Sequence, residues 1–140
     1  MLAAIHQRLL DAAPGLTDVQ VAESLEAVGA GTKPRSGTAF IIPWREAAQA
    51  SPYSTGTFRQ EVIVQVIVAF LVRSHVDAKG AARAAEFDGV KSAIEGALAG
   101  WEPPGAILPM ELVSGDADPQ GNGATLYAQV WQTARFLTGA

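Results

Sequence analysis

The two histidines, His6 and His75, are the residues of this chain best suited to acid–base or metal chemistry. His75 follows Ser74 and lies two residues before Asp77, so a nucleophile, a base and an acid are close in sequence. Adjacent residues point in different directions, however, and no Gly-x-Ser-x-Gly elbow is present. A zinc site needs three or four converging ligands, and the chain has 2 histidines and 0 cysteines. The sequence therefore predicts no catalytic residue, no metal site and no cofactor.

The acidic segment 116–121 is similar to the start of a calcium-binding loop, but the twelfth position is Tyr127 instead of an acid. The glycine-rich segments 29–31 and 121–123 lack the spacing of phosphate-binding loops. We expect residues 115–123 to form a turn between two strands.

The three tryptophans, Trp44, Trp101 and Trp131, could line a ligand pocket, but such residues more often anchor cores or interfaces. Trp101 is expected in the core, at the end of a helix. Trp44 and Trp131 are expected at an interface or on the surface of the sheet.

The composition argues against several partners. The net charge is −4 and no cluster of basic residues occurs, which disfavours specific nucleic-acid binding. The most apolar run, 62–72, is too short for a membrane helix, which needs about 20 residues, and the N-terminus does not have the pattern of a secretory signal. Charged residues make up 17% of the chain, against about 25% in typical soluble domains, so another subunit is expected to cover part of its surface.

The segment Thr57–Arg73 is rich in β-branched residues and predicts one long strand. At about 3.3 Å per residue it would exceed the diameter of a compact domain, so it must curl, bulge or reach onto a neighbour. Its alternate residues are apolar on both faces, unlike a sheet with one wet face. Two explanations remain open: the chain's own helices cover both faces, or a neighbouring subunit covers part of one.

The remaining pattern predicts a helix at 1–12, a short strand followed by a short helix within 16–28, and a strand at 38–43 ended by proline. A helix at 78–99 follows the long strand and a turn at 74–77, and strands are expected at 107–114 and 124–136. The fold class is therefore α+β, with a mostly antiparallel sheet of about four to five strands and helices packed on one face.

An ordered set of segments in this chain resembles the tail terminator proteins of tailed bacteriophages, in particular those of Mu-like phages, siphophages and gene transfer agents. The segments are AFIIP (39–43), RQEVIVQVIVAFLV (59–72), ALAGWEPP (97–104), LPMELVSGD (108–116) and LYAQVWQTAR (126–135). The resemblance covers nearly all of the chain as one domain, 1–140, and it departs at the loop 31–37.

The resemblance implies a virion structural protein without enzymatic activity. It implies a homo-oligomeric ring, commonly of six copies, at the head-proximal end of the tail tube, in the neck region of a particle assembled in the host cytoplasm. There it would end tube polymerisation, with the tail tube protein and the head–tail connector as partners. The alternatives are another head–tail joining or tail-completion protein, or a small-ligand binding domain.

Three groups of residues are candidates for the contacts of such a ring. The candidates at the ends of the long strand are Arg59, Glu61 and Arg73. Trp44, Arg45 and Glu46 follow the short strand and are expected to reach a neighbour. The loops at 31–37 and 116–123, with Lys33, Arg35, Asp116 and Asp118, are expected to contact the tube or the connector.

Overall fold

The computed structural model describes residues 1–30, 34–51, 58–73, 81–121 and 124–139. The helices and strands of these residues are α1 (Leu2–Ala12), β1 (Asp18–Val21), α2 (Leu25–Ala30), β2 (Thr38–Ala48), β3 (Arg59–Arg73), α3 (Ala81–Leu98), β4 (Glu111–Gly121) and β5 (Ala124–Thr138).

The strands form one sheet in the order β1-β2-β3-β5-β4, so the long strand β3 is central. Only the β1–β2 pair is parallel, and the other three pairs are antiparallel. This confirms the predicted α+β class and its mostly antiparallel sheet.

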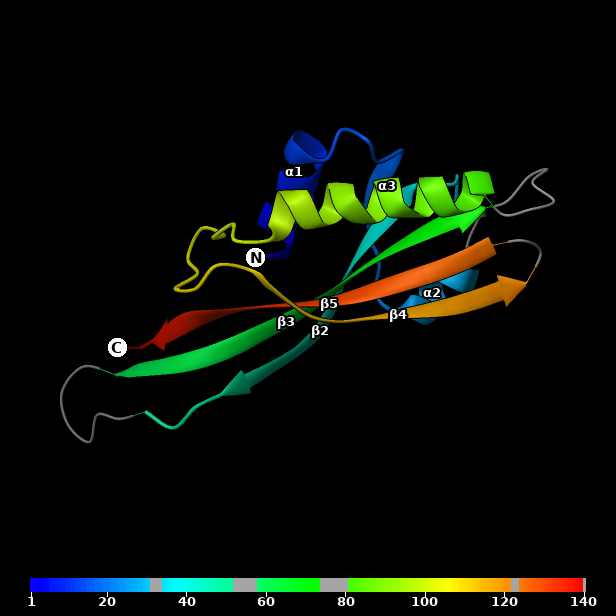
Figure 1. Ribbon diagram of the computed structural model, residues 1–140. Coiled ribbons are helices and arrows are strands. Elements are labelled where there is room, and N and C mark those ends of the chain that lie inside the picture. Colours follow the sequence, from blue (N-terminus) through cyan, green and yellow to red (C-terminus); the bar gives the residue numbers. More distant parts are fainter. Residues whose placement is uncertain (31–33, 52–57, 74–80, 122–123, 140) are drawn as a thin grey trace.

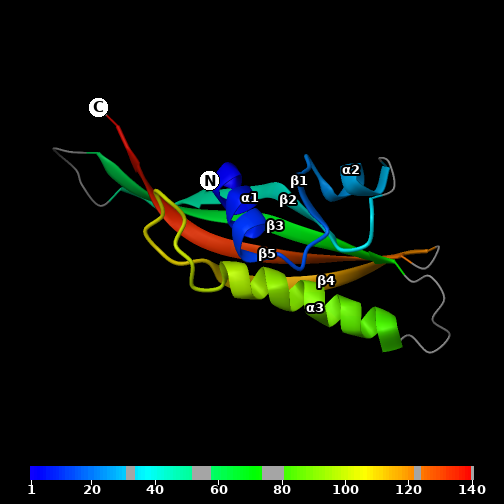
Figure 2. The same cartoon turned by 90° about the horizontal axis from the view of Figure 1, so that it is seen from above.

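The long strand keeps one continuous register with β5 from Arg59 opposite Thr138 to Arg73 opposite Ala124. Its fifteen residues correspond to roughly 50 Å at about 3.3 Å per residue. Figures 1 and 2 show that β2, β3 and β5 continue past α1 and α3 at one end. The predicted excess length is therefore real, and it carries the sheet beyond its own helices.

One face of the sheet packs under α1 and α3, as Figure 1 shows. Ile5 and Leu9 of α1, and Ile94 and Leu98 of α3, are completely buried there. Their i, i+4 spacing places each pair on one side of its helix, which is why these sequences form amphipathic helices against a sheet. The even-numbered residues of β3 from Val62 to Val72 belong to the same cluster.

The opposite face has a second, smaller core. Phe40 and Ile42 of β2 contribute to it, and α2 adds Leu25 and Val28. From β3 come the odd-numbered residues Ile67, Ala69 and Leu71. The six-residue helix α2 thus differs from the expectation that helices pack on one face. Two explanations for the apolar faces of β3 were left open above. From Val66 to Val72 the first one holds, because the chain itself buries both faces there.

Two predicted strand boundaries are wrong. The strand expected at 38–43 continues to Ala48, because a register shift between Pro43 and Arg45 lets the ladder to β3 resume after the proline. The strand expected at 107–114 begins instead at Glu111 and runs to Gly121, through most of the turn expected at 115–123. The long partner β5 offers a complete ladder, and this outweighs the low strand propensity of the glycine and aspartates. The expected turn at 74–77 lies outside the described residues, and the helix expected at 78–99 is described as Ala81–Leu98.

The prediction for Trp131 is also wrong, because its side chain is only 1% exposed and belongs to the core under the helices. It lies opposite Val66 on the covered face, and its indole nitrogen donates to Gln129 Oε1 at 3.2 Å. Trp101 is partly buried against the same core, and the Arg8 guanidinium lies 5.4 Å from its ring centroid. Trp44 is half exposed at the sheet edge, as expected.

Candidate assembly surface

The part of the sheet that reaches past the helices consists of Arg45–Ala48, Arg59–Gln65 and Gln132–Thr138, and we call it the sheet extension. Near its start Gln65 Nε2 donates to Gln132 Oε1 at 2.8 Å between the paired strands. Beyond this pair Phe136 and Leu137 are 39% and 43% exposed. Figure 1 shows no helix over this end of the sheet, so its apolar side chains are open to a partner.

A salt bridge crosses the sheet extension on its helix-facing side. Arg135 lies opposite Val62 and Glu46 lies opposite Val64, and their side chains meet over β3 with Arg135 Nη2 3.1 Å from Glu46 Oε1. Val62 and Val64 lie beneath this ion pair and belong to the helix-side core, against which Met1 and Leu2 also pack. Glu46 is thus occupied within the chain.

The far end of the extension brings Arg59 onto an aromatic ring. Its guanidinium lies 4.5 Å from the centroid of Phe136, a cation–π contact between β3 and β5. Glu61 lies opposite Phe136, and its backbone oxygen accepts from the backbone N–H of Gln49. The structure therefore places both predicted residues on the extension, close to exposed Phe58 and Leu137.

Arg73 lies at the opposite end of β3. Its Nε donates to the backbone oxygen of Pro34 at 3.0 Å, and its backbone N–H donates to Ser36 Oγ. Arg73 therefore fixes the segment that follows the loop and is used within the chain. Arg35 is exposed nearby, whereas Lys33 lies outside the described residues.

Trp44 occupies the register shift of β2 and separates two hollows. Pro43, Val64 and Val66 line one of about 530 Å³, together with the first residues of α1. Glu23–Glu26, Ile42 and Ile67 line the other, of about 420 Å³, on the α2 side. The guanidinium of Arg45 lies 4.9 Å from the centroid of the Trp44 ring. An exposed tryptophan with an arginine stacked on it, beside a recess with apolar walls, is a composition enriched in interface centres.

Asp116 and Asp118 belong to the edge strand β4, and not to a loop as predicted. They lie opposite Ala128 and Leu126 and are exposed. Earlier in the same strand Leu112 and Val113 are 48% and 49% exposed. This surface was not predicted, because the turn was expected at 115–123 and β4 continues as a strand to Gly121.

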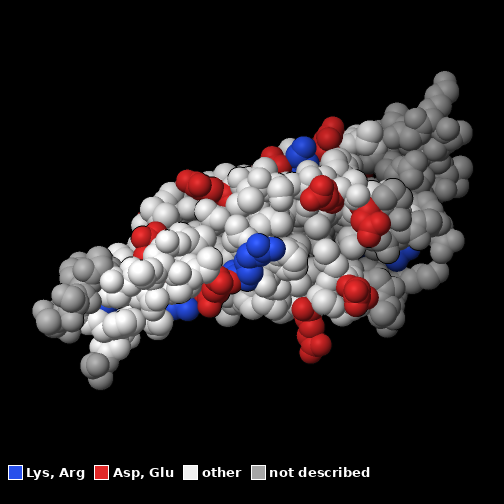
Figure 3. Space-filling view, turned by 90° about the horizontal axis from the view of Figure 1, so that it is seen from below, with Lys and Arg blue, Asp and Glu red and all other residues white. Residues whose placement is uncertain are grey.

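The face opposite α1 and α3 is mostly uncharged, with separate acidic groups and few basic ones, as Figure 3 shows. This fits the scattered basic residues of the sequence. The described residues on this face form no basic tract of the kind that follows a phosphate backbone.

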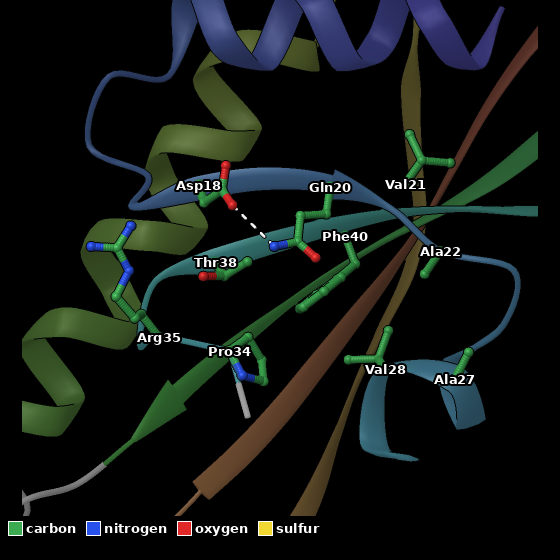
Figure 4. Close-up of a pocket in the computed structure, with 10 residues that line it drawn as sticks. All are labelled: Asp18, Gln20, Val21, Ala22, Ala27, Val28, Pro34, Arg35, Thr38 and Phe40. Atoms are coloured by element: carbon green, nitrogen blue, oxygen red, sulfur yellow. Dashed lines mark hydrogen bonds between the residues drawn. The ribbon is translucent and has the colours of Figure 1, made fainter. Parts of the chain in front are cut away.

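A third hollow, of about 540 Å³, lies between β1, α2 and β2 and is shown in Figure 4. Asp18, Gln20 and Arg35 line it together with apolar Val28 and Phe40. The carboxylate of Asp18 already accepts from Gln20 Nε2 at 3.0 Å and from the Val19 backbone N–H at 2.8 Å. No buried side-chain nitrogen or oxygen of the described residues lacks a hydrogen-bond partner, so no unsatisfied polar group points into this hollow.

Asp18→Asn is expected to lower the melting temperature slightly near neutral pH, with an effect that shrinks as the pH falls below the ordinary pKa of an aspartate. The hydrogen bond from Gln20, followed by that from Val19, lowers the pKa of Asp18 below its ordinary value. A lowered pKa in the folded state adds stability above the unfolded pKa, and this contribution is lost as pH falls through the folded pKa. Thermal melts of both proteins across acidic pH measure it, and a difference that does not shrink with pH would contradict it.

The residues with potential for chemistry do not form a site in the described parts of the chain. His6 Nε2 is hydrogen-bonded to the backbone oxygen of Val19 at 3.0 Å and so joins α1 to β1. Among the described residues no group of three or more His, Asp or Glu could hold a metal ion. Ser74, His75 and Asp77 lie outside them. No described helix is long and apolar enough to cross a membrane.

Comparison with known proteins shows the family. Residues 1–139 match the phage tail terminator protein family, and the chain therefore belongs to it. One chain in the virion of a native gene transfer agent particle has a similar fold, with a TM-score of 0.62 and 17% identity over 99% of this chain and 95% of that one. No curated protein matches the chain. The predicted family is thus confirmed, and the protein is a structural component of the tail of a phage particle.

Proposed function

We propose that copies of this protein form a closed ring, commonly of six, at the head-proximal end of the tail tube. The ring ends polymerisation of the tube protein and joins the tail to the head connector. Each copy is a single domain, acts without catalysis or cofactor, and joins the particle after folding in the host cytoplasm.

The observation that carries this proposal is the pair of free edges at opposite sides of the sheet. β4 has no strand on its outer side among the described residues, and β2 has β1 beside it only from Thr38 to Ile41. Two different surfaces at opposite edges favour a heterologous contact, in which one edge meets the other edge of the next copy. Such contacts generate a ring when the rotation closes, and a ring fits the family.

The two ends of the sheet are then available for contacts along the tail axis. At one end lies the sheet extension with Arg59, Glu61 and exposed Phe136. At the other end lies Arg73, opposite Ala124 at the start of β5, and Arg73 contacts Pro34, the neighbour of Arg35 in sequence. We assign the tube and the connector to these two ends, one to each.

The test is a particle-producing strain that lacks this gene. Negative-stain images of its tails are expected to show tubes of variable, excessive length and few particles with heads attached. Supplying the intact protein from a plasmid should restore a uniform length. Tails of normal length without the protein would refute the proposal.

A further inference from the structure

The contact between neighbouring copies can be assigned to particular residues. We propose that Leu112 and Val113 of one copy dock beside Trp44 of the next, and that Arg45 there pairs with Glu111. This inference rests on the proposed ring and names its lateral contact.

Arg45 is a cation that the described part of its own chain leaves without a carboxylate. The salt bridge found there joins Arg135 to Glu46, so the neighbouring acid is already neutralised. Arg45 contacts the ring of Trp44 instead, and both side chains are exposed. The edge of β2 therefore presents one positive charge beside a large apolar surface.

The hollow at this edge is apolar and open. Its apolar walls are Leu2, Pro43, Val64 and Val66, and Trp44, Arg45, Glu46 and Gln65 also line it. Aliphatic side chains entering it would lose contact with water at about 25 cal/mol per Å², and the indole would be covered at the same time.

The edge of β4 has the complementary features. Val113 is the extra residue of a register shift between Leu112 and Ser114, and a bulge of this kind turns a side chain out of the regular ladder. Leu112 and Val113 are both about half exposed, and Leu108 beside them is 45% exposed. Glu111, directly before them, is exposed and makes no ion pair with the described residues.

Charge also distinguishes the two edges. The strand β4 carries the exposed acids Glu111 and Asp116 and no basic residue. Two β4 edges would therefore repel each other, whereas a β4 edge and the Arg45 edge attract. Because like charges at a contact suppress the wrong pairing, a second copy arranged head to tail is the occupant that fits.

The first experiment is a charge exchange. Arg45→Glu and Glu111→Arg, each alone, are expected to reduce the fraction of particles with a ring about tenfold, because each places like charges together. The double variant should recover most of that fraction. Both positions are exposed, so melting temperatures near that of the intact protein serve as the folding control. Failure of the double variant to recover would overturn the assignment.

The second experiment uses the absence of cysteine, since the chain has 0. No native cysteine can therefore form a competing disulfide. Trp44→Cys and Val113→Cys are combined in one chain, and the assembled rings are oxidised. A ladder of covalent oligomers up to the ring is expected on a non-reducing gel. The matched control combines Leu10→Cys, at a position 46% exposed on α1, with Val113→Cys, and should give no ladder.

The two proposals fail in different ways. Rings visible in micrographs without the Trp44–Val113 ladder would overturn this contact and leave the ring intact. Normal tails without the protein would refute the ring itself.

Discussion

Replacing Phe70 by alanine is expected to lower the free energy of unfolding by about 3–5 kcal/mol. Phe70 is completely buried near the C-terminal end of the central strand. Its ring centroid lies 5.3 Å from that of Phe87 on α3 and 5.4 Å from that of Tyr127 on β5. The substitution removes the contact between helix and sheet and leaves a cavity that rigid neighbours cannot fill. The total free energy of unfolding of such a domain is about 5–15 kcal/mol, so this loss is a large share of it.

Urea denaturation followed by tryptophan fluorescence measures this loss. Phe136→Ala is the matched control, because it removes the same side chain from β5 at a position 39% exposed on the sheet extension. It loses mainly the cation–π contact with Arg59, worth about 0.5–1 kcal/mol at exposed sites. Equal destabilisation by the two variants would show that the core is not centred on Phe70.

Replacing Gly115 by alanine is expected to destabilise the protein by about 1–3 kcal/mol. A Cβ built at this position would lie 2.8 Å from Tyr127 Cζ, closer than side chains tolerate. The ring of Tyr127 cannot easily move away, because its centroid is 5.0 Å from that of Phe87, which it meets edge-on. The edge strand β4 would shift instead, and with it the proposed contact at Leu112 and Val113.

A double-mutant cycle isolates the cause. In a Tyr127→Ala background, Gly115→Ala should lower the free energy of unfolding much less, because the ring that clashes with the added Cβ is absent. Gly89→Ala and Gly96→Ala on α3 are the controls: a Cβ there meets nothing within 4 Å, and helix propensity predicts a gain of about 0.5–1 kcal/mol each. An undiminished cost of Gly115→Ala without the tyrosine ring would contradict the clash.

Most of the fold was predicted from the periodic spacing of apolar residues in the sequence. The β-branched run of β3 and the i, i+4 spacing on α1 and α3 are local signals, and these elements lie where the pattern indicated. Strand boundaries predicted from these local signals were wrong where pairing with a neighbouring strand outweighs local propensity. Pro43 does not end β2, because the ladder resumes at Arg45, and the glycine and aspartates of β4 are held as a strand by β5.

The candidate site was predicted in part. Trp44 and Arg45 were named from their place after a short strand, and the structure puts them at an open edge. Glu46 was named as well, but it pairs with Arg135, from a strand that begins far later in the sequence. Glu111, Leu112 and Val113 were missed because nothing local marks an edge strand. Which of these residues contact a neighbour stays a prediction.

The amino-acid sequence by itself determined the family and the excess length of the central strand. These follow from residue order, β-branching and residue types, which need no contact between distant segments. The tertiary structure alone decided which edges of the sheet are free and which charges are already paired. Strand order and cross-strand pairing join residues such as Glu46 and Arg135, and no local pattern records that proximity.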